Sequence, residues 1–275
     1  GDNQVASLYR DRLGTFWVGT WYAGVSRVDL GSGGFARIVR RDDALDALAD
    51  NKAAALLADG DKLWVGSGTA LNHVDPATGQ ATVYRHDPHD PNSLIDMPAT
   101  AIARDRKGLL WIGSRTGITS FDPVSRRFVR QLLPGDADAN NVRGVTAGPD
   151  GFMWITTRGG LHRLDPVTRK VESWRHDPAR STSLADDTVR PVLHDRRGRM
   201  WVGTFDGLDL MDRASGRFRH FRHDPFDAAS LSHDEVHYLF EDSRGDIWVG
   251  TAVGLNRMVT AGDGSVSFVR YTTRD

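Results

Sequence analysis

The chain has 275 residues, of which 35 are basic and 36 acidic, so its formal net charge at pH 7 is −1. This balance gives no electrostatic reason to expect contact with nucleic acid or with an anionic membrane. Cysteine is absent, which excludes disulfides, cysteine nucleophiles and thiolate metal sites. No apolar run approaches the ~18 residues of a membrane-spanning helix, and Gly1 opens the chain without a signal sequence. We therefore expect a segment of a longer protein.

A tetrapeptide that begins with tryptophan recurs along the chain. It reads Trp, then Val or Ile, then Gly or Thr, then Thr or Ser, and successive copies lie 43 or 47 residues apart. The six copies begin at Trp17, Trp64, Trp111, Trp154, Trp201 and Trp248. A period of this length is typical of stacked supersecondary units. The repeats are expected at about 1–46, 47–91, 92–137, 138–181, 182–228 and 229–275, within a single domain of residues 1–275.

Each repeat predicts four short strands in a fixed order. In the fifth repeat these are 189–194, 200–204, 208–211 and 218–221, separated by turn residues. The first turn is of the Asp-x-x-Gly type, with its aspartate at Asp11, Asp105, Asp195 and Asp242 in four repeats. No segment has a sustained 3.6-residue period. The pattern predicts an all-β fold, a β-propeller of six four-stranded antiparallel blades, with most of a seven-bladed propeller as the alternative.

The motif residues are expected to have separate tasks in a blade. Trp and Gly of the motif point to one face of the second strand and Val to the other. We expect the indole to fill the gap between blades, and the glycine to let the next blade approach closely. The turn aspartate should accept backbone N–H groups of its own turn, and we do not interpret it as part of a catalytic carboxylate array. Three substitutions depart from the pattern, at Ala70, Gly148 and Thr156.

The sixth repeat resembles the two-component regulator propeller repeat, in the stretch Asp-Ser-Arg-Gly-Asp-Ile-Trp-Val-Gly-Thr-Ala-Val-Gly-Leu-Asn-Arg that begins at Asp242. The Asp-Pro turns, such as Asp122-Pro123, and the Ser-Leu-x-x-Asp-x-Val segments at Ser183–Val189 and Ser230–Val236 are similar to the same family. The resemblance covers all six repeats. It implies the extracytoplasmic sensor propeller of a membrane-anchored bacterial histidine kinase or diguanylate cyclase, located in the periplasm or outside the cell. The best-known members of the family respond to oligosaccharides.

Histidine–aspartate pairs follow the fourth strand in three repeats, at His86-Asp87, His176-Asp177 and His223-Asp224. A metal needs its ligands within ~2–2.6 Å, whereas equivalent positions on a propeller lie far apart. We interpret these pairs as residues that fix loops by hydrogen bonding. His233 and His237 have the spacing of His-Glu-x-x-His, but residues four apart on a strand are about 13 Å apart. We therefore predict no metal site and no cofactor.

The loops between second and third strands, and the starts of first strands, differ between repeats. Repeat proteins often bind ligands through such variable segments. The predicted ligand contacts on this top face of the propeller are Trp21, Tyr22, Arg115, Arg143, Arg158, Arg190, Phe205, Asp206 and His237. Their mixture of aromatic, arginine and acidic side chains suits a small polar ligand, with an oligosaccharide as the candidate.

Three functions remain open from the sequence. The first is a ligand-binding sensor without catalytic residues, which dimerises or docks on neighbouring domains of its own protein and has no nucleic-acid or membrane contact. The second is a propeller enzyme similar to streptogramin lyases or sialidases, to which only the region around His237 could contribute. The third is a scaffold for protein–protein interaction. No nucleophile elbow, phosphate loop or dinucleotide fingerprint occurs, so we predict no catalytic residue.

Overall fold

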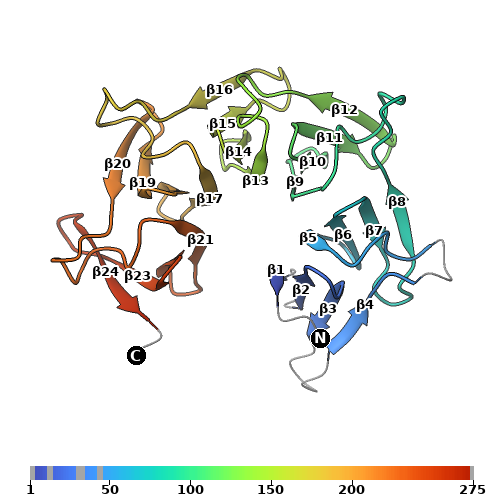
Figure 1. Cartoon of the computed structure of the whole chain (residues 1–275), viewed down its shortest axis with the longest axis horizontal. Coiled ribbons are helices and arrows are strands. Elements are labelled where there is room, and N and C mark those ends of the chain that lie inside the picture. Colours follow the sequence, from blue (N-terminus) through green and yellow to red (C-terminus); the bar gives the residue numbers. More distant parts are fainter. Residues whose placement is uncertain (1–3, 11–14, 29–34, 42–45, 273–275) are drawn as a thin grey trace. The chain divides into compact units, whose positions relative to one another are not determined.

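The computed structural model of the chain describes residues 4–10, 15–28, 35–41 and 46–272. Within these ranges it contains strands and turns but no helix. The strands form six four-stranded antiparallel sheets, the blades of a β-propeller, each with its strands in chain order (Figure 1). The predicted fold class is therefore confirmed. Asp11, where a turn aspartate was predicted, lies outside the described residues.

The structure divides into two compact units, the first of which comprises Gly1–Leu133 and Asn140–Ala147. Its three complete blades consist of β1 (Val5–Arg10), β2 (Phe16–Thr20), β3 (Val25–Val28) and β4 (Phe35–Ile38); β5 (Ala53–Asp59), β6 (Lys62–Ser67), β7 (Leu71–Val74) and β8 (Ala81–Tyr84); and β9 (Ala101–Arg104), β10 (Leu110–Gly113), β11 (Ile118–Asp122) and β12 (Arg127–Gln131). It also holds β13 (Val142–Ala147), the first strand of the fourth blade.

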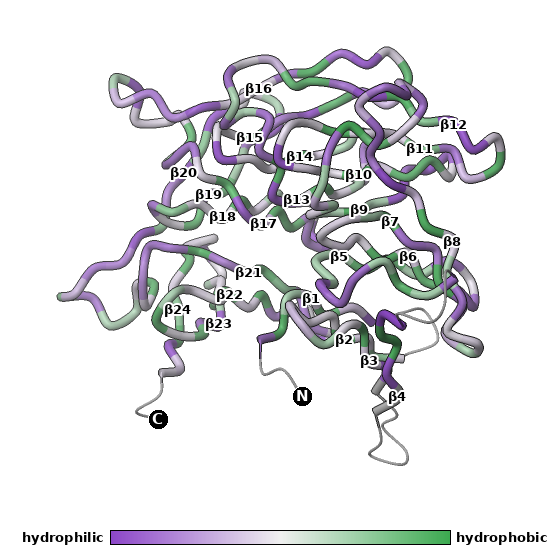
Figure 2. The backbone as a smooth tube through the Cα atoms, turned by 45° about the vertical axis from the view of Figure 1, so that its right-hand side comes forward, coloured by the Kyte–Doolittle hydropathy of each residue, from purple (hydrophilic) through white to green (hydrophobic). Residues whose placement is uncertain are grey.

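The second unit comprises Pro134–Ala139 and Gly148–Asp275. Its strands are β14 (Met153–Thr157), β15 (Gly160–Leu164) and β16 (Val171–Trp174) of the fourth blade; β17 (Val189–His194), β18 (Met200–Thr204), β19 (Gly207–Asp212) and β20 (Arg217–Phe221); and β21 (Val236–Glu241), β22 (Ile247–Thr251), β23 (Gly254–Thr260) and β24 (Val266–Tyr271). The predicted bounds of the fifth repeat match β17 and β18; they differ from β19 by one residue at each end and from β20 by one residue at its start. The connecting loops are mostly hydrophilic (Figure 2).

The motif tryptophan of one blade packs against the next blade, as expected. Trp201 is fully buried and lies in a cluster with Leu231, Val236 and Ile247 of the blade that follows. At the motif glycine the next blade approaches closely. A Cβ atom at Gly203 would lie 2.6 Å from Cγ1 of Val236. Any larger side chain at this position would push the two blades apart.

The turn aspartates hold both their own turn and the tryptophan six residues later. One oxygen of Asp195 accepts the backbone N–H of Arg199 (2.8 Å), and the other accepts Nε1–H of Trp201 (3.0 Å). Burial alone would raise the pKa of Asp195, but hydrogen bonds from Trp201 and Arg199 outweigh it and lower that pKa. Asp105 and Asp242 make the same two kinds of contact. The predicted turn bonds are confirmed, and the bond to the indole is an addition.

The fourth blade lacks this aspartate, and its tryptophan is unpaired as a result. Gly148 occupies the position, and Nε1 of the buried Trp154 has no hydrogen-bond partner among the described residues. A buried N–H group without an acceptor destabilises a fold by about 1–3 kcal/mol. Above the ring lies Arg163, whose guanidinium carbon is 5.8 Å from the centroid of the indole. The guanidinium also pairs with Glu172 at 2.7 Å.

The first strand of four blades carries a β-bulge near its start. The register shifts lie between Val5 and Ser7, Ala53 and Ala55, Val189 and Val192, and Val236 and Tyr238. A bulge leaves one or more residues without a cross-strand partner and re-aims their side chains. Arg190 and His237 are bulge residues in the second unit, and Ala6 and Ala54 occupy this place in the first.

One polar side chain on the third strand of a blade ties down the segment before the first strand. Asn256 and Asn72 each accept a backbone N–H from that segment, at 2.9 Å from Ser232 and 3.0 Å from Ala49. In the fifth blade the equivalent residue is Asp209, which is fully buried and accepts the N–H of Ala185 at 2.9 Å. Its second oxygen lies 2.6 Å from Nδ1 of His220. An aspartate–histidine pair thus stands where two other blades have an asparagine, and burial raises the pKa of Asp209.

We expect Asp209→Asn to change how stability depends on pH above pH 6.5. The hydrogen bond to Asp209 is the main cause that raises the pKa of His220 above 6.5. The hydrogen bond from protonated His220 to Asp209 therefore stabilises the fold below pH 6.5. This contribution is lost as the pH rises through the raised pKa of His220. Asparagine keeps the acceptor for Ala185, as Asn72 and Asn256 do, but removes the charge. Urea unfolding at pH 6 and pH 9 should show a smaller difference for the variant, and equal differences would contradict the pairing.

Candidate ligand-binding site

The histidine–aspartate pairs fix the loops that follow the fourth strands. Nδ1 of His86, His176 and His223 lies 2.7, 2.9 and 2.7 Å from the backbone oxygen of a leucine eight residues later. These three contacts confirm the loop-fixing interpretation. Among the described residues, no group of three or more His, Asp or Glu side chains is placed to hold a metal ion.

Four side chains converge where the first strands of the fifth and sixth blades begin. Arg190 comes from β17, Phe205 from the turn between β18 and β19, Glu235 from the residue just before β21, and His237 from the start of β21. β17 and β21 lie next to each other (Figure 1). The guanidinium carbon of Arg190 is 5.0 Å from the ring centroid of Phe205, and the ring of His237 stacks on Phe205 at 6.1 Å and 21°. We call these four residues the bulge cluster.

The hydrogen bonds of His237 define its tautomer. Nδ1 lies 3.3 Å from Nη1 of Arg190, and a guanidinium can only donate, so Nδ1 must accept. The proton of a neutral ring is then on Nε2, which lies 3.3 Å from Oε2 of Glu235. Both ring nitrogens are therefore engaged within the cluster. His233 is used differently, since its Nδ1 accepts the backbone N–H of Glu235 at 3.0 Å.

Two further predicted residues lie in the second unit and are held by ion pairs. Asp206, beside Phe205, accepts two N–H groups of Arg222, at 3.0 Å from Nε and 2.8 Å from Nη2. Arg158 lies 3.6 Å from Asp138. Each of these side chains already has a partner of opposite charge, which a ligand would have to share or displace.

The other four predicted residues lie in the first unit. Trp21 is covered on one face by Lys52, whose Nζ is 4.6 Å from the ring centroid, and Tyr22 is 71% exposed. Arg115 and Arg143 are exposed. The bulge cluster therefore contains three of the nine predicted contacts, Arg190, Phe205 and His237. A ligand contact at any of the nine remains a prediction.

Glu235 is the member of the bulge cluster that the sequence prediction omitted. It is one of only three glutamates in the chain, and it stands two residues before His237. Glutamate is rare in a chain so rich in aspartate, and this rarity could have identified Glu235 as a candidate site residue. Its position just outside the strand hid it, because strand alternation assigns no face to a residue that precedes the strand.

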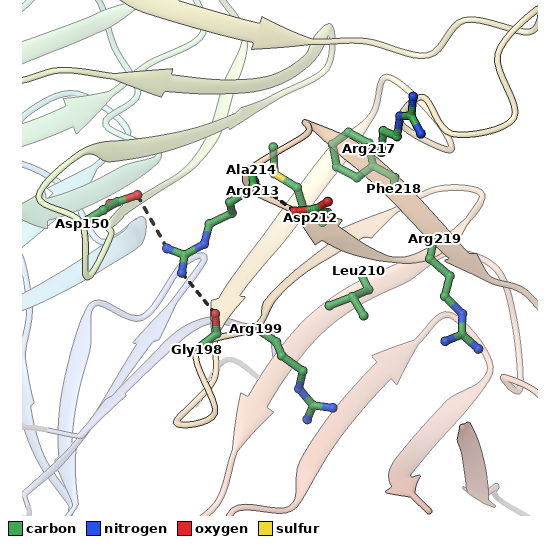
Figure 3. A pocket seen from close by; sticks show the side chains of 11 residues that line it. Asp150, Gly198, Arg199, Leu210, Asp212, Arg213, Ala214, Arg217, Phe218 and Arg219 are labelled. Atoms are coloured by element: carbon green, nitrogen blue, oxygen red, sulfur yellow. Dashed lines mark hydrogen bonds and ion pairs between the residues drawn. The ribbon is translucent and has the colours of Figure 1, made fainter. Parts of the chain in front are cut away.

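A separate pocket lies along β19 and β20 and has a volume of about 730 Å³. Its lining includes Arg199, Arg213, Arg217 and Arg219 (Figure 3). Arg213 reaches across it to Asp150 (3.7 Å) and donates to the carbonyl of Gly198 (3.2 Å). Arg199 is paired with Asp195 at 2.6 Å. These two arginines therefore serve the fold, and none of the nine predicted contacts lines this pocket.

The described part of the chain contains no helix with the length and apolar character needed to cross a bilayer. Among curated proteins, none matches the sequence of the chain. Solved structures show the same fold. The extracellular domain of the hybrid two-component system BT3049 from B. thetaiotaomicron is 22% identical with a TM-score of 0.69, over 98% of this chain and 40% of that one. The chain thus spans less than half the length of that relative.

Two other structures are similar at lower or comparable identity. Virginiamycin B lyase from Staphylococcus aureus is 14% identical with a TM-score of 0.72, over 100% of this chain and 86% of the lyase. PorZ, a surface component of the type-IX secretion system of Porphyromonas gingivalis, is 20% identical with a TM-score of 0.72, over 100% of this chain and 42% of PorZ. At these identities the likenesses show the fold alone.

The family model of the two component regulator propeller matches three segments, residues 1–22, 93–116 and 230–252. Each segment ends just after a motif tryptophan, at Trp17, Trp111 and Trp248. The matches agree with the resemblance drawn from the sequence. Three segments of the chain are therefore similar to repeats of the two component regulator propeller.

Proposed function

We propose that the chain is the ligand-binding sensor propeller of a membrane-anchored bacterial signalling protein, placed in the periplasm or outside the cell. It binds a small polar ligand, a saccharide, and has no catalytic role. The bulge cluster carries this proposal. It combines an aromatic face, Phe205, with the polar groups of Arg190, Glu235 and His237, and sugars are bound through such mixed surfaces. The repeat family and the extracellular sensor relative BT3049 support it.

Signal output is proposed to pass through contacts of this propeller with a second copy or with neighbouring domains of its own protein. BT3049 is an extracellular domain, of which this chain matches 40%. The chain's net charge of −1 gives nucleic acid no electrostatic reason to bind. Nucleic acid and lipid are therefore not proposed as partners of this segment.

The enzyme alternative depends on the same histidine. The pair formed by Glu235 and His237 could serve general base chemistry on this fold, which virginiamycin B lyase also has. Nδ1 of His237, however, already accepts from Arg190. A base at this position would first have to give up that bond, and for this reason we propose binding over catalysis. Turnover of a bound saccharide by the wild type, abolished in His237→Ala, would reverse this choice.

We expect saccharide binding to raise the thermal stability of the wild type and not of Phe205→Ala. A ligand at 100 times its Kd adds about 2.7 kcal/mol to the free energy of unfolding. The measurement is thermal unfolding against a panel of neutral and acidic oligosaccharides. Phe226→Ala is the matched control, because this phenylalanine is 97% exposed on another loop. Cooperative unfolding with no shift from any oligosaccharide would refute the proposed function.

A further inference from the structure

Arg190 is a cation without an anion. In the described residues it forms no ion pair with an Asp or Glu, and its Nε is buried with no hydrogen-bond partner. Other arginines of the second unit near the same edge are neutralised. Arg158 lies 3.6 Å from Asp138, Arg175 lies 3.2 Å from Asp136, and Arg222 lies 2.8 Å from Asp206. Each of these three arginines has a carboxylate partner, whereas Arg190 has none among the described residues.

Among the residues that the structure describes, Arg190 also has none of the backbone acceptors that occupy a purely structural arginine. Arg270 donates to the carbonyl oxygens of Asp227 (2.7 Å) and Ser230 (2.8 Å), and has three backbone acceptors in all. Those acceptors explain why Arg270 needs no carboxylate. Among the described residues, the Arg190 guanidinium instead contacts the imidazole of His237 and the face of a phenyl ring. Neither of them neutralises its charge.

The neighbouring Glu235 does not supply the missing charge. Its Oε2 lies 3.3 Å from Nε2 of His237, so the imidazole stands between the carboxylate and the guanidinium. A cation partly withdrawn from water is unfavourable unless it is paired. Arg217 and Arg219 on β20 also form no ion pair with described residues, but both are exposed, and water solvates them.

We infer that the ligand of the bulge cluster is an acidic saccharide whose anionic group binds Arg190. This inference rests on the proposed function and narrows it. A carboxylate matches the planar guanidinium and takes two parallel N–H bonds from it. The sugar ring then contacts Phe205, the aromatic side chain over whose ring the guanidinium lies. Glu235 repels an anion on the Nε2 side of His237, so the acidic group is favoured only at Arg190, on the Nδ1 side. The sugar therefore binds in one orientation.

The test compares one saccharide with and without its charge. Calorimetric titration of the wild type with tri-galacturonate, a sulfated disaccharide and the fully methyl-esterified tri-galacturonate varies the charge and leaves the protein unchanged. We expect at least tenfold weaker binding of the ester than of the free acid, and weaker binding of the preferred acid as salt increases. Tighter binding of the sulfated disaccharide than of tri-galacturonate would keep Arg190 as the anion site and identify the anionic group of the ligand as a sulfate.

Arginine variants locate the site. Arg190→Gln should weaken binding of the acid at least tenfold. Arg190→Lys keeps the charge but loses the planar guanidinium, so its affinity for the acid should lie between those of the wild type and Arg190→Gln. Arg217→Gln is the matched control, since it removes an unpaired arginine from the pocket of Figure 3. Equal binding of ester and acid, with loss in Phe205→Ala, overturns this inference and keeps the proposed function. Loss in Arg217→Gln and not in Arg190→Gln also overturns it, and no binding of any saccharide overturns both.

Discussion

Replacing Trp201 with alanine is expected to lower the free energy of unfolding by about 3–5 kcal/mol, the usual range for a buried tryptophan. The indole is fully buried among residues of two blades, and its loss also leaves Asp195 with one hydrogen bond fewer. Urea unfolding followed by far-ultraviolet circular dichroism measures the change. Because the chain is only marginally stable, as proteins of this size are, the variant should unfold at much lower urea.

Trp248→Ala is the matched control for this prediction. Trp248 stands at the same position of the sixth blade and makes the same bond to an aspartate, Asp242, at 3.1 Å. It is only half-buried, and a Cβ atom at its motif glycine, Gly250, would contact nothing closer than its own blade's Tyr238 at 3.4 Å. We therefore expect a clearly smaller loss. Equal losses for the two tryptophans would show that packing between blades is not what the indole contributes.

The second large effect is expected from His162→Asn in acid. Burial lowers the pKa of His162 from 6.5 to about 4, so the folded chain keeps this imidazole neutral where the unfolded chain protonates it. Stability is then lost as the pH falls from about 6.5 to about 4, and the sign is that of a depressed histidine pKa. At ~1.4 kcal/mol per pKa unit, the loss from this residue is about 3 kcal/mol.

Asparagine is the right replacement, because Asn72 and Asn256 occupy the equivalent position in two other blades. His162 bridges Ser173 (2.8 Å) and Thr157 (3.2 Å), which an amide can also do in part. We expect the variant to lose less stability than the wild type between pH 8 and pH 4. Its urea midpoint should therefore fall less than that of the wild type over this range. Parallel stability curves for the two proteins between pH 8 and pH 4 would contradict the assignment.

The fold could be predicted from the sequence because its determinants are local and repeat. Trp201, Gly203 and Asp195 recur with fixed spacing, and strand, turn and packing face follow from alternation and turn chemistry. The bond from Asp195 to Trp201 was not predicted, since the spacing of six residues across a hairpin has meaning only once the register is known.

The candidate site was predicted only in part, for a geometric reason. Arg190 and His237 are equivalent residues of successive repeats, and they touch because the first strands of neighbouring blades lie side by side. The histidine–aspartate loops are equivalent too, yet each contacts its own blade and the next segment of chain. Sequence spacing is the same in both cases, so it cannot tell which equivalent residues meet. Pairing of Arg158 and Asp206 with acidic and basic partners also depends on tertiary contacts.

The bulge at the start of the first strand lets a core residue and the residue directly after it evolve under different constraints. Val189 and Val236 stay in the core, while the residue directly after each, Arg190 or His237, has left the ladder. Substitutions at the second position can therefore accumulate without disturbing the first, as the alanines at positions 6 and 54 illustrate. A lineage that duplicates such blades inherits a stable frame with one adjustable residue per copy. Under the proposed function, new ligand preferences can then arise from single codon changes, without passing through unfolded intermediates.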